Sequence, residues 1–351
     1  MYQQKYFNIY FEEGDRGMLS QPIFMIGTQR SGSNLLRLML NQLEEIASPH
    51  PPHILKRMFP LLEYYKDLSE PQNFKQLTND VCRLVELNPV PWKGVTLDRD
   101  EVISRCREKS LVAIYGAVYD ICAETWGART WCCKSLENIE YITEIEKYFT
   151  NPRYIYLYRD GRDVALSFRK AIVGEKHMYN IATNWANTQT IGLNLKDKYD
   201  PSNFFSISYE DLVQDTESSA KRLCTFLGVT YNSSMLEFYR SDEAKRSAES
   251  SALWNSVTKP VIKDNIQKYL HEASKGDITI FESVAGHVLD NLGYKRVYVK
   301  RGKEKRYSDE EIAEFNIENE RLKQELLGTM DKQDIIRRDR QASLLSEIRS
   351  R

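Results

Sequence analysis

Short apolar runs alternate with amphipathic stretches along much of the chain. Runs typical of buried strands cover Pro22–Ile26, Thr130–Cys133, Tyr154–Tyr158 and Phe204–Ser208. Helical periodicity fills the segments between them, and residues 54–126 are predicted to be mainly helical, with breaks at prolines. Strands that alternate with helices form parallel sheets covered on both faces. The pattern therefore predicts an α/β fold, a three-layer sandwich around a central, mostly parallel sheet.

The sequence changes character beyond Tyr294, where charged residues of both signs become dense. We expect an N-terminal segment over residues 1–20, one main domain over 21–297 and a charged helical C-terminal extension over 298–351. In the extension, Asn319 occupies a core-type position of a 3-4 spacing. The apolar members of this spacing are Ile312, Phe315, Leu322 and Leu326. The spacing suits either a short coiled coil, through which copies of the chain would form a homo-oligomer, or an amphipathic helix folded onto its own domain.

The composition is that of an ordinary globular protein, and it narrows the set of partners. The 49 basic and 50 acidic residues leave a net charge of −1, so there is no global field to collect nucleic acid or an acidic membrane. Residues 1–20 lack the apolar core of a signal peptide, and no apolar run is long enough to span a membrane. The six cysteines lack the spacing of a zinc site or a disulfide framework. We therefore predict no nucleic-acid partner, no membrane span and a cytoplasmic protein with reduced thiols.

A glycine-rich loop follows the first predicted strand and leads directly into a helix. From Gly27 to Asn34 it reads Gly-Thr-Gln-Arg-Ser-Gly-Ser-Asn. Glycines permit a tight turn, and the start of the helix offers unpaired N–H groups and a positive dipole end to an anion. Gly27 and Gly32 have the spacing of a P-loop, but Ser33 stands in place of its lysine and Asn34 in place of its magnesium-binding hydroxyl. This P-loop-like segment predicts a site for a nucleotide-like anion, with Arg30 as its cation; alone, it would also fit an ordinary strand-to-helix turn.

Two later segments support the anion site. The strand that ends at Tyr158 is followed by Arg159, a turn and a helix that carries Ser167, and Tyr209 begins a Tyr-Glu-Asp-Leu segment after the last predicted strand. Together with the first loop, these ordered segments resemble the sulfotransferases that depend on 3′-phosphoadenosine 5′-phosphosulfate (PAPS). Members of that family move a sulfuryl group from PAPS to an acceptor. The resemblance extends from about Gln21 to Tyr294.

The resemblance implies how PAPS is bound. In the family, the first loop, typically R-S-G-[ST]-[ST], holds the 5′-phosphosulfate, and an R-[DN]-x-[RK]-D-x-x-x-S segment holds the 3′-phosphate. A tyrosine of the Y-E-D-L segment lies near the adenine. Asn34 departs from the commoner Ser or Thr, which leaves the role of its side chain open, while its backbone amide belongs to the predicted cradle. The corresponding residues here are Arg30, Ser31, Gly32, Ser33 and Asn34 for the phosphosulfate, Arg159 and Ser167 for the 3′-phosphate, and Tyr209 for the adenine.

Sulfuryl transfer needs cations and a general base, because an acceptor oxygen attacks in line while the leaving phosphate gains charge. Arg30 is the first cation, and Lys134, just past a predicted strand, is the second by resemblance. In some relatives the general base is a Glu or a His that lies shortly after the first helix. At this place the present chain has Ser-Pro-His-Pro-Pro-His, which ends at His53. A histidine accepts a proton near neutral pH without a large shift of its pKa. His53 matches best and His50 is the alternative; the histidine that other relatives place two residues after the lysine is Leu136 here.

The sequence therefore predicts a PAPS-dependent sulfotransferase that releases adenosine 3′,5′-bisphosphate (PAP), needs no metal and acts on a hydroxyl acceptor of a class that the motifs do not specify. Two alternatives stay open. One is a P-loop kinase or other nucleotide-binding protein that uses Mg–ATP. The other is a catalytically silent scaffold of the same fold that oligomerises through its tail.

Overall fold

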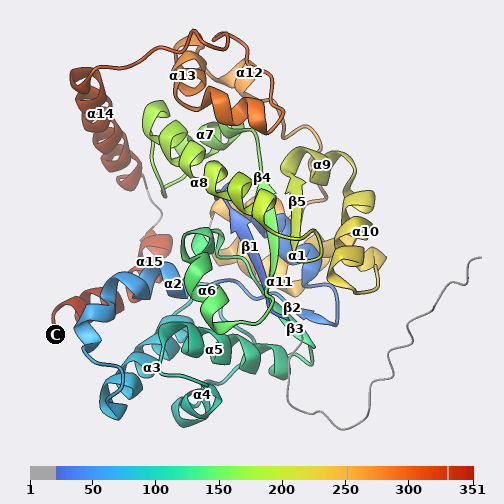
Figure 1. Ribbon diagram of the computed structural model, residues 1–351, viewed down its shortest axis with the longest axis vertical. Helices are drawn as coiled ribbons and strands as arrows, with labels where there is room; N and C mark the ends of the chain where they lie inside the picture. Colours follow the sequence, from blue (N-terminus) through green and yellow to red (C-terminus); the bar gives the residue numbers. More distant parts are fainter. Residues whose placement is uncertain (1–20, 251, 330–331) are drawn as a thin grey trace, which may run out of the picture.

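The structure is a computed structural model that describes residues 21–250, 252–329 and 332–351. The segment predicted over residues 1–20 lies outside the described residues. Figure 1 shows a central sheet with helices on both sides and further helices at two ends of the molecule.

The sheet is parallel throughout the described residues. Its strands lie side by side in the order β2-β3-β1-β4-β5. Their bounds are Ile23–Gly27 for β1, Ile46–Ala47 for β2, Thr130–Cys133 for β3, Arg153–Tyr158 for β4 and Phe204–Ser208 for β5. The four strands predicted from apolar runs are confirmed to within a residue at each end. The two-residue β2 was not predicted, because so short a strand has no periodicity of its own.

Successive residues of the strands point into two separate cores, as the pleat requires. Phe24 and Ile26 of β1 face one core, whereas Ile23 and Met25 face the other. The first core is covered by α2 (Ile54–Met58), η1 (Phe59–Tyr65), α3 (Pro71–Glu86), α4 (Arg99–Arg105), α5 (Leu111–Thr125), η2 (Leu136–Tyr141) and α6 (Ile142–Tyr148). The second is covered by α1 (Ser33–Leu40), α9 (Tyr209–Gln214), α10 (Thr216–Leu227), η3 (Ser233–Arg240), α11 (Asp242–Ser250) and η4 (Ala252–Thr258). The predicted three-layer α/β fold is confirmed.

A third core joins three helices beyond strand β4. Helices α7 (Gly161–Lys170), α8 (Met178–Lys198) and α13 (Lys275–Asn291) pack around Trp185 and Phe281, with α12 (Tyr269–Glu272) against α7. In Figure 1 this group lies above the sheet, on the side where β4 ends.

The first helix of the extension, α14 (Asp309–Leu327), packs on α8 of its own chain. The Asn319 amide oxygen accepts hydrogen bonds from the backbone N–H groups of Lys176 (2.7 Å) and His177 (2.9 Å). The Phe315 ring stacks on the His177 ring with 4.5 Å between centroids. Of the two interpretations of the 3-4 spacing, the structure shows the helix folded onto its own domain. Self-association through the extension stays a prediction.

The last helix, α15 (Lys332–Arg349), returns to the other end of the molecule and packs on α3 and η1 (Figure 1). It buries Leu344 and Ile348 in the first core. Arg351 then forms an ion pair with the buried Asp80 of α3. The extension therefore contacts the main domain at two separate places, on α8 and on α3.

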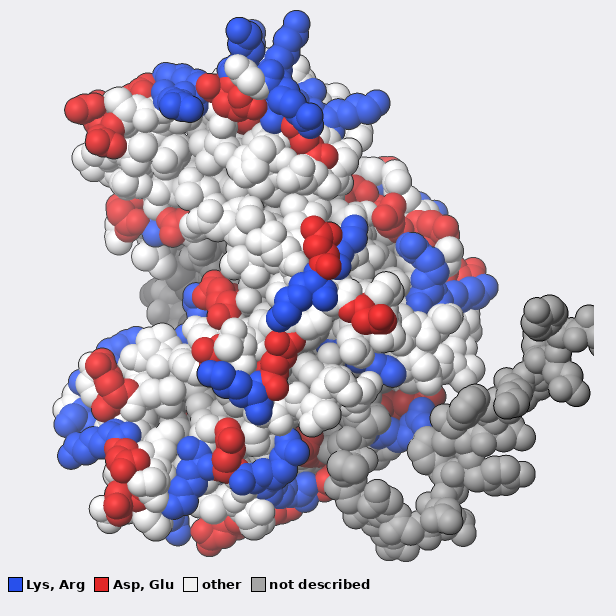
Figure 2. Space-filling view, in the orientation of Figure 1, with Lys and Arg blue, Asp and Glu red and all other residues white. Residues whose placement is uncertain are grey.

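The molecular surface carries charges of both signs. Figure 2 shows acidic and basic side chains interspersed over the face in view, in keeping with the net charge of −1. Among the described residues, no helix combines the length and the apolar character needed to cross a membrane.

Candidate functional site

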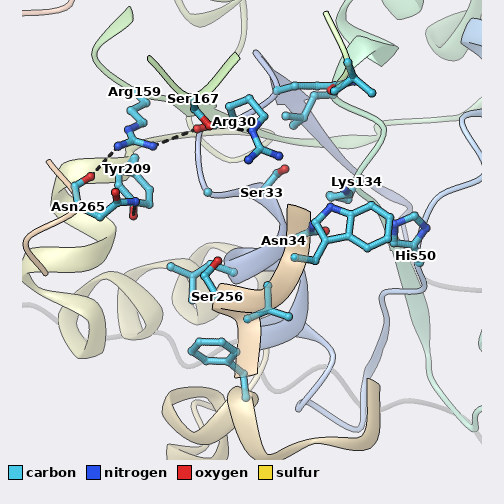
Figure 3. A pocket seen from close by; sticks show the side chains of 18 of the residues that line it. Arg30, Ser33, Asn34, His50, Lys134, Arg159, Ser167, Tyr209, Ser256 and Asn265 are labelled. Atoms are coloured by element: carbon cyan, nitrogen blue, oxygen red, sulfur yellow. Dashed lines mark hydrogen bonds between the residues drawn. The ribbon is translucent and has the colours of Figure 1, made fainter. Parts of the chain in front are cut away.

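A cavity of about 360 Å³ opens where the strands end (Figure 3). Ligands of open α/β sheets bind at this edge, outside the carboxyl ends of the strands. With one exception, the predicted site residues line this cavity: Arg30, Gly32, Ser33, Asn34, His50, His53, Lys134, Arg159, Ser167 and Tyr209. The exception is Ser31, which is fully buried. The strand-end geometry explains the clustering, since Lys134 directly follows β3, Arg159 follows β4 and Tyr209 follows β5.

Two glycines shape the loop between β1 and α1. Gly27 has a φ of 134°, and a Cβ atom there would lie 2.2 Å from the backbone oxygen of Leu157 in β4. Gly32 has a φ of 88°, and a Cβ atom there would lie 2.4 Å from the Tyr209 ring. Both positions combine a left-handed backbone with a close neighbour, which only glycine tolerates. The loop is therefore pressed against β4 and Tyr209, and α1 begins immediately after it at Ser33.

Arg30 projects from the same loop with a φ of 70°, which is uncommon for a residue other than glycine and clusters at functional sites. Its Nε donates a hydrogen bond to the Ser167 hydroxyl (2.9 Å), and Arg159 Nη1 donates to the Arg30 backbone oxygen (3.2 Å). Burial and the neighbouring Arg159 charge lower the pKa of Arg30. The resemblance assigns Arg30 to the 5′-phosphosulfate and Ser167 to the 3′-phosphate, which are different ends of PAPS. In the structure the two side chains are joined by a hydrogen bond.

Arg159 is held in place from several sides. Its guanidinium lies 4.3 Å from the centroid of the Tyr209 ring, and Nη2 donates to the backbone oxygen of Asn265 (2.6 Å). Asp163 lies at 3.6 Å from Nη2. Asn265 also donates through its amide to the Tyr209 hydroxyl (2.8 Å). Figure 3 shows Arg159, Ser167 and Arg30 along one end of the cavity, with Lys134 and His50 at the other.

Lys134 is the second cation of the site and is 8% exposed. Burial, followed by the charges of Arg37 and Arg30, lowers the pKa of Lys134 to about 7. Arg37 is itself neutralised by Glu243, whose carboxylate accepts from Nη1 at 2.9 Å. Within the described ranges, no carboxylate forms an ion pair with Lys134 or Arg30. A buried site with uncompensated cations is suited to an anionic ligand.

His53 forms an acid–base pair with a residue that the sequence gave no reason to select. His53 caps α2 with a φ of 57°, and its Nδ1 lies 3.4 Å from a carboxylate oxygen of Glu137. Burial would raise the pKa of Glu137, but the His53 charge and the hydrogen bond from Gln29 outweigh it and lower the pKa to about 2. Glu137 is therefore an anion that lies at ion-pair distance from His53 Nδ1, with no hydrogen bond formed between the two atoms, and Nε2 is the other ring nitrogen, which a ligand can use. Glu137 lies at the start of η2 and belongs to no motif, so only the fold reveals it.

His50 lies deeper, at 4% exposure. Its Nδ1 is 3.3 Å from the Asn88 amide oxygen, and Asn88 Nδ2 donates to the His50 backbone oxygen at 2.7 Å. Burial, followed by the charges of Lys134 and Arg37, lowers the pKa of His50 well below 6.5. His50 is thus a neutral ring that binds a proton weakly. Of the two histidines, the surroundings favour His53 as a base.

Several buried polar atoms of the cavity have no protein partner. Among the described residues, Ser31 Oγ, Asn34 Oδ1 and Arg159 Nε are buried without a hydrogen bond. Buried polar groups are normally paired, so these three fit a polar ligand held by the loop. In the same part of the chain, no group of three His, Cys, Asp or Glu side chains is arranged to hold a metal ion. The site therefore fits an extended polyanion bound by cations and amides.

The fold and this site define an α/β protein with a parallel central sheet and a cationic cavity at the carboxyl ends of its strands. Comparison with known proteins gives the family. Residues 22–233 match the model of the sulfotransferase family, and the chain belongs to that family.

The relatives agree with this assignment. The chain is 24% identical over 280 residues to protein-tyrosine sulfotransferase A of Caenorhabditis elegans. The matched region covers 78% of this chain and 67% of the relative. The sulfotransferase domain from the curacin biosynthetic pathway superposes with a TM-score of 0.58 at 22% identity, over 80% of this chain and all of that domain. The sulfotransferase domain of the Synechococcus PCC 7002 olefin synthase gives a TM-score of 0.54 at 18% identity, over 82% and 99% of the two chains. At these identities, the two domains support the fold alone.

Proposed function

We propose that this sulfotransferase uses PAPS as its donor and a hydroxyl compound as its acceptor, and that it releases PAP. One observation carries the proposal: Arg30, Lys134 and Arg159 gather around the start of α1, in the same cavity as the His53–Glu137 pair. The three cations would bind the several anionic groups of the donor. The His53–Glu137 pair would remove the proton of the acceptor hydroxyl.

The donor would extend along the cavity. Arg159 and Ser167 would hold the 3′-phosphate, with Arg159 fixed by Tyr209 and Asn265. The loop amides and Ser31 would hold the 5′-phosphosulfate, next to Arg30 and Lys134. Charge-assisted hydrogen bonds of this type are the stronger ones, and a planar guanidinium matches phosphate geometry.

The chain's own groups account for the transfer. PAPS supplies the sulfuryl group. His53 Nε2 accepts the proton of the acceptor hydroxyl while the acceptor oxygen bonds to sulfur. Arg30 and Lys134 stabilise the charge that the 5′-phosphate gains as its bond to sulfur breaks and the electron pair leaves with it. Glu137 stabilises the protonated His53.

A double-label assay separates the proposal from its rivals. The protein is incubated, in parallel samples with EDTA and with magnesium, with a mixture of sugar, phenol and alcohol acceptors and either ³⁵S-labelled PAPS or γ-³²P-labelled ATP. We expect ³⁵S transfer that EDTA does not reduce and no ³²P transfer with or without magnesium. Magnesium-dependent ³²P transfer would establish the kinase, and loss of ³⁵S transfer on EDTA treatment would contradict the expected independence from metal.

The pKa of Lys134 predicts how donor binding depends on pH. In the free protein this pKa is about 7. A bound phosphate favours the charged ammonium and raises the pKa. The contribution of Lys134 to binding is therefore complete below pH 7 and is lost as the pH rises from about 7 toward the pKa in the complex.

Calorimetry at pH 8 measures this coupling directly. PAP is titrated in two buffers of different ionisation enthalpy, and we expect net proton uptake on binding. Lys134→Met is expected to remove the uptake, whereas Lys170→Met, at an exposed lysine of α7, is expected to retain it. Equal uptake by wild type and Lys134→Met would show that another group titrates.

A further inference from the structure

A second, smaller cavity adjoins the first on the histidine side. It has a volume of about 150 Å³ and shares His50, His53, Arg57 and Trp254 with the larger cavity. It contains none of the residues of the glycine-rich loop, and neither Arg30 nor Arg159 lines it. Its other lining residues are Pro51, Asn88, Pro89, Ser250 and Gln341. A compound in this cavity would contact both histidines without overlapping the residues assigned to the donor.

We propose that this second cavity binds the acceptor and that the acceptor is a polyhydroxylated six-membered ring of the pyranose type. One ring hydroxyl would donate to His53 and react, and a neighbouring hydroxyl would donate to His50 Nε2. The inference rests on the proposed function and names the substrate class for that same site.

The hydrogen bonds around His50 determine which of its ring nitrogens carries the proton. Asn88 Nδ2 donates to the His50 backbone oxygen at 2.7 Å, which turns the Asn88 oxygen toward His50 Nδ1, 3.3 Å away. An amide oxygen only accepts, so the proton of the neutral ring lies on Nδ1. Nε2 then carries no proton and can accept a hydrogen bond. It is buried and has no hydrogen-bond partner among the described residues.

A buried hydrogen-bond acceptor without a partner favours a ligand that brings a hydrogen-bond donor. A phenol has a single hydroxyl, and when that group donates to His53 it leaves His50 Nε2 unpaired. A simple alcohol has the same deficiency. A ring with several hydroxyl groups offers a hydrogen-bond donor to each of the two histidines that line this cavity. The arrangement therefore distinguishes acceptors by the second hydroxyl, not by the reacting one.

The size and lining of the cavity agree with such a ring. A cavity of about 150 Å³ is of the size that accommodates one six-membered ring. Its lining residues include neither a carboxylate nor a large aliphatic side chain, so a lipid tail finds little apolar surface there. Trp254 packs against His50 with 4.7 Å between ring centroids, and it supplies an aromatic surface for the C–H groups of a sugar ring.

The C-terminal extension closes one side of this cavity. Gln341 of α15 is 3% exposed, and its amide donates to the backbone oxygen of Leu84 (2.8 Å) and accepts from Arg57. Gln341 lies beyond the family match, which ends at residue 233. The wall that limits acceptor length is thus contributed by a part of this chain outside the matched region.

The test uses the full-length protein and begins with a PAP titration, which examines the proposed function by itself. Transfer of ³⁵S from PAPS is then measured to methyl glucoside, galactoside and mannoside and to myo-inositol, against 4-methylphenol and a tyrosyl peptide. Octyl glycosides, compared with methyl glycosides, distinguish a lipid-linked sugar from a free one. We expect kcat/KM for the best ring to exceed that for the phenol and the peptide by at least about 10-fold, because one of the two histidines is left unpaired with the latter.

Deoxy analogues of the best ring make the inference specific to His50. Removing the hydroxyl next to the reacting one is expected to lower kcat/KM about 10-fold or more in the wild type and to have little effect in His50→Phe. His287→Phe, at an exposed histidine of α13, is the matched control and should retain the full penalty. PAP binding by each variant reports that it is folded.

Either of two results would overturn the inference while the proposed function stands: PAP binds but the phenol or the peptide is preferred to every ring, or the wild type sulfates deoxy analogues as well as their parents. The deoxy series on the wild type decides the matter even where His50→Phe fails to fold. A protein that does not bind PAP fails the proposed function, and the acceptor inference falls with it.

Discussion

Replacing His53 with alanine is expected to lower kcat by about 10²–10⁴-fold, the range that a positioned general base contributes. The geometry behind this expectation is the 3.4 Å separation of His53 Nδ1 and Glu137, which leaves Nε2 for the acceptor proton. Donor binding should change little, because the cations assigned to the donor do not depend on His53. The measurement is ³⁵S transfer under saturating PAPS, together with a PAP titration of the same preparation.

Two further variants establish what His53 does. Glu137→Gln keeps the shape of the side chain but removes the charge that stabilises protonated His53, so we expect a smaller loss of kcat with PAP binding retained. His271→Ala changes a histidine of α12 that does not line the cavity and should leave kcat unaltered. Unchanged turnover in His53→Ala would transfer the role of base to His50 or to another group.

Replacing Arg159 with alanine is expected to weaken PAP binding about 10–150-fold, which corresponds to about 1.5–3 kcal/mol for a hydrogen bond to a charged group. Binding of AMP, which lacks the 3′-phosphate, should change far less. The difference between the two ligands isolates the 3′-phosphate contact from any general loosening of the site. Calorimetric titration of both ligands provides the comparison.

The matched control is Arg169→Ala, on the same helix as Ser167. Arg169 is exposed, pairs with Asp277 and does not line the cavity. It should leave both affinities unchanged. If Arg159→Ala weakened AMP and PAP equally, Arg159 would act on the shape of the loop through its bond to the Arg30 backbone oxygen, not on the 3′-phosphate.

The parts of the site that follow strand ends could be predicted from the sequence. A strand, a turn and a helix are local features, and the parallel sheet brings their junctions to one edge. Arg30 and Arg159 are predicted in this way, Lys134 and Tyr209 need the family resemblance as well, and all four line one cavity. The assignment of each to a group of the donor stays a prediction.

The remaining features depend on contacts between distant segments, which no local pattern encodes. Glu137 meets His53 only because η2 packs on α2. Asn265 and Trp254 reach the cavity from segments without a motif. The 3-4 spacing around Asn319 describes an amphipathic helix equally well whether its partner is another copy of the chain or its own α8, and the structure shows the latter.

The central claim, a donor with a 3′-phosphate, is tested most directly by calorimetric titration of the wild-type protein with PAP in EDTA, with AMP and ADP as comparison ligands. The account predicts tight binding of PAP and binding of AMP and ADP that is weaker by about 10-fold or more, since each lacks the contact with Arg159. Equal affinity for PAP and AMP, or binding that requires magnesium, would contradict it.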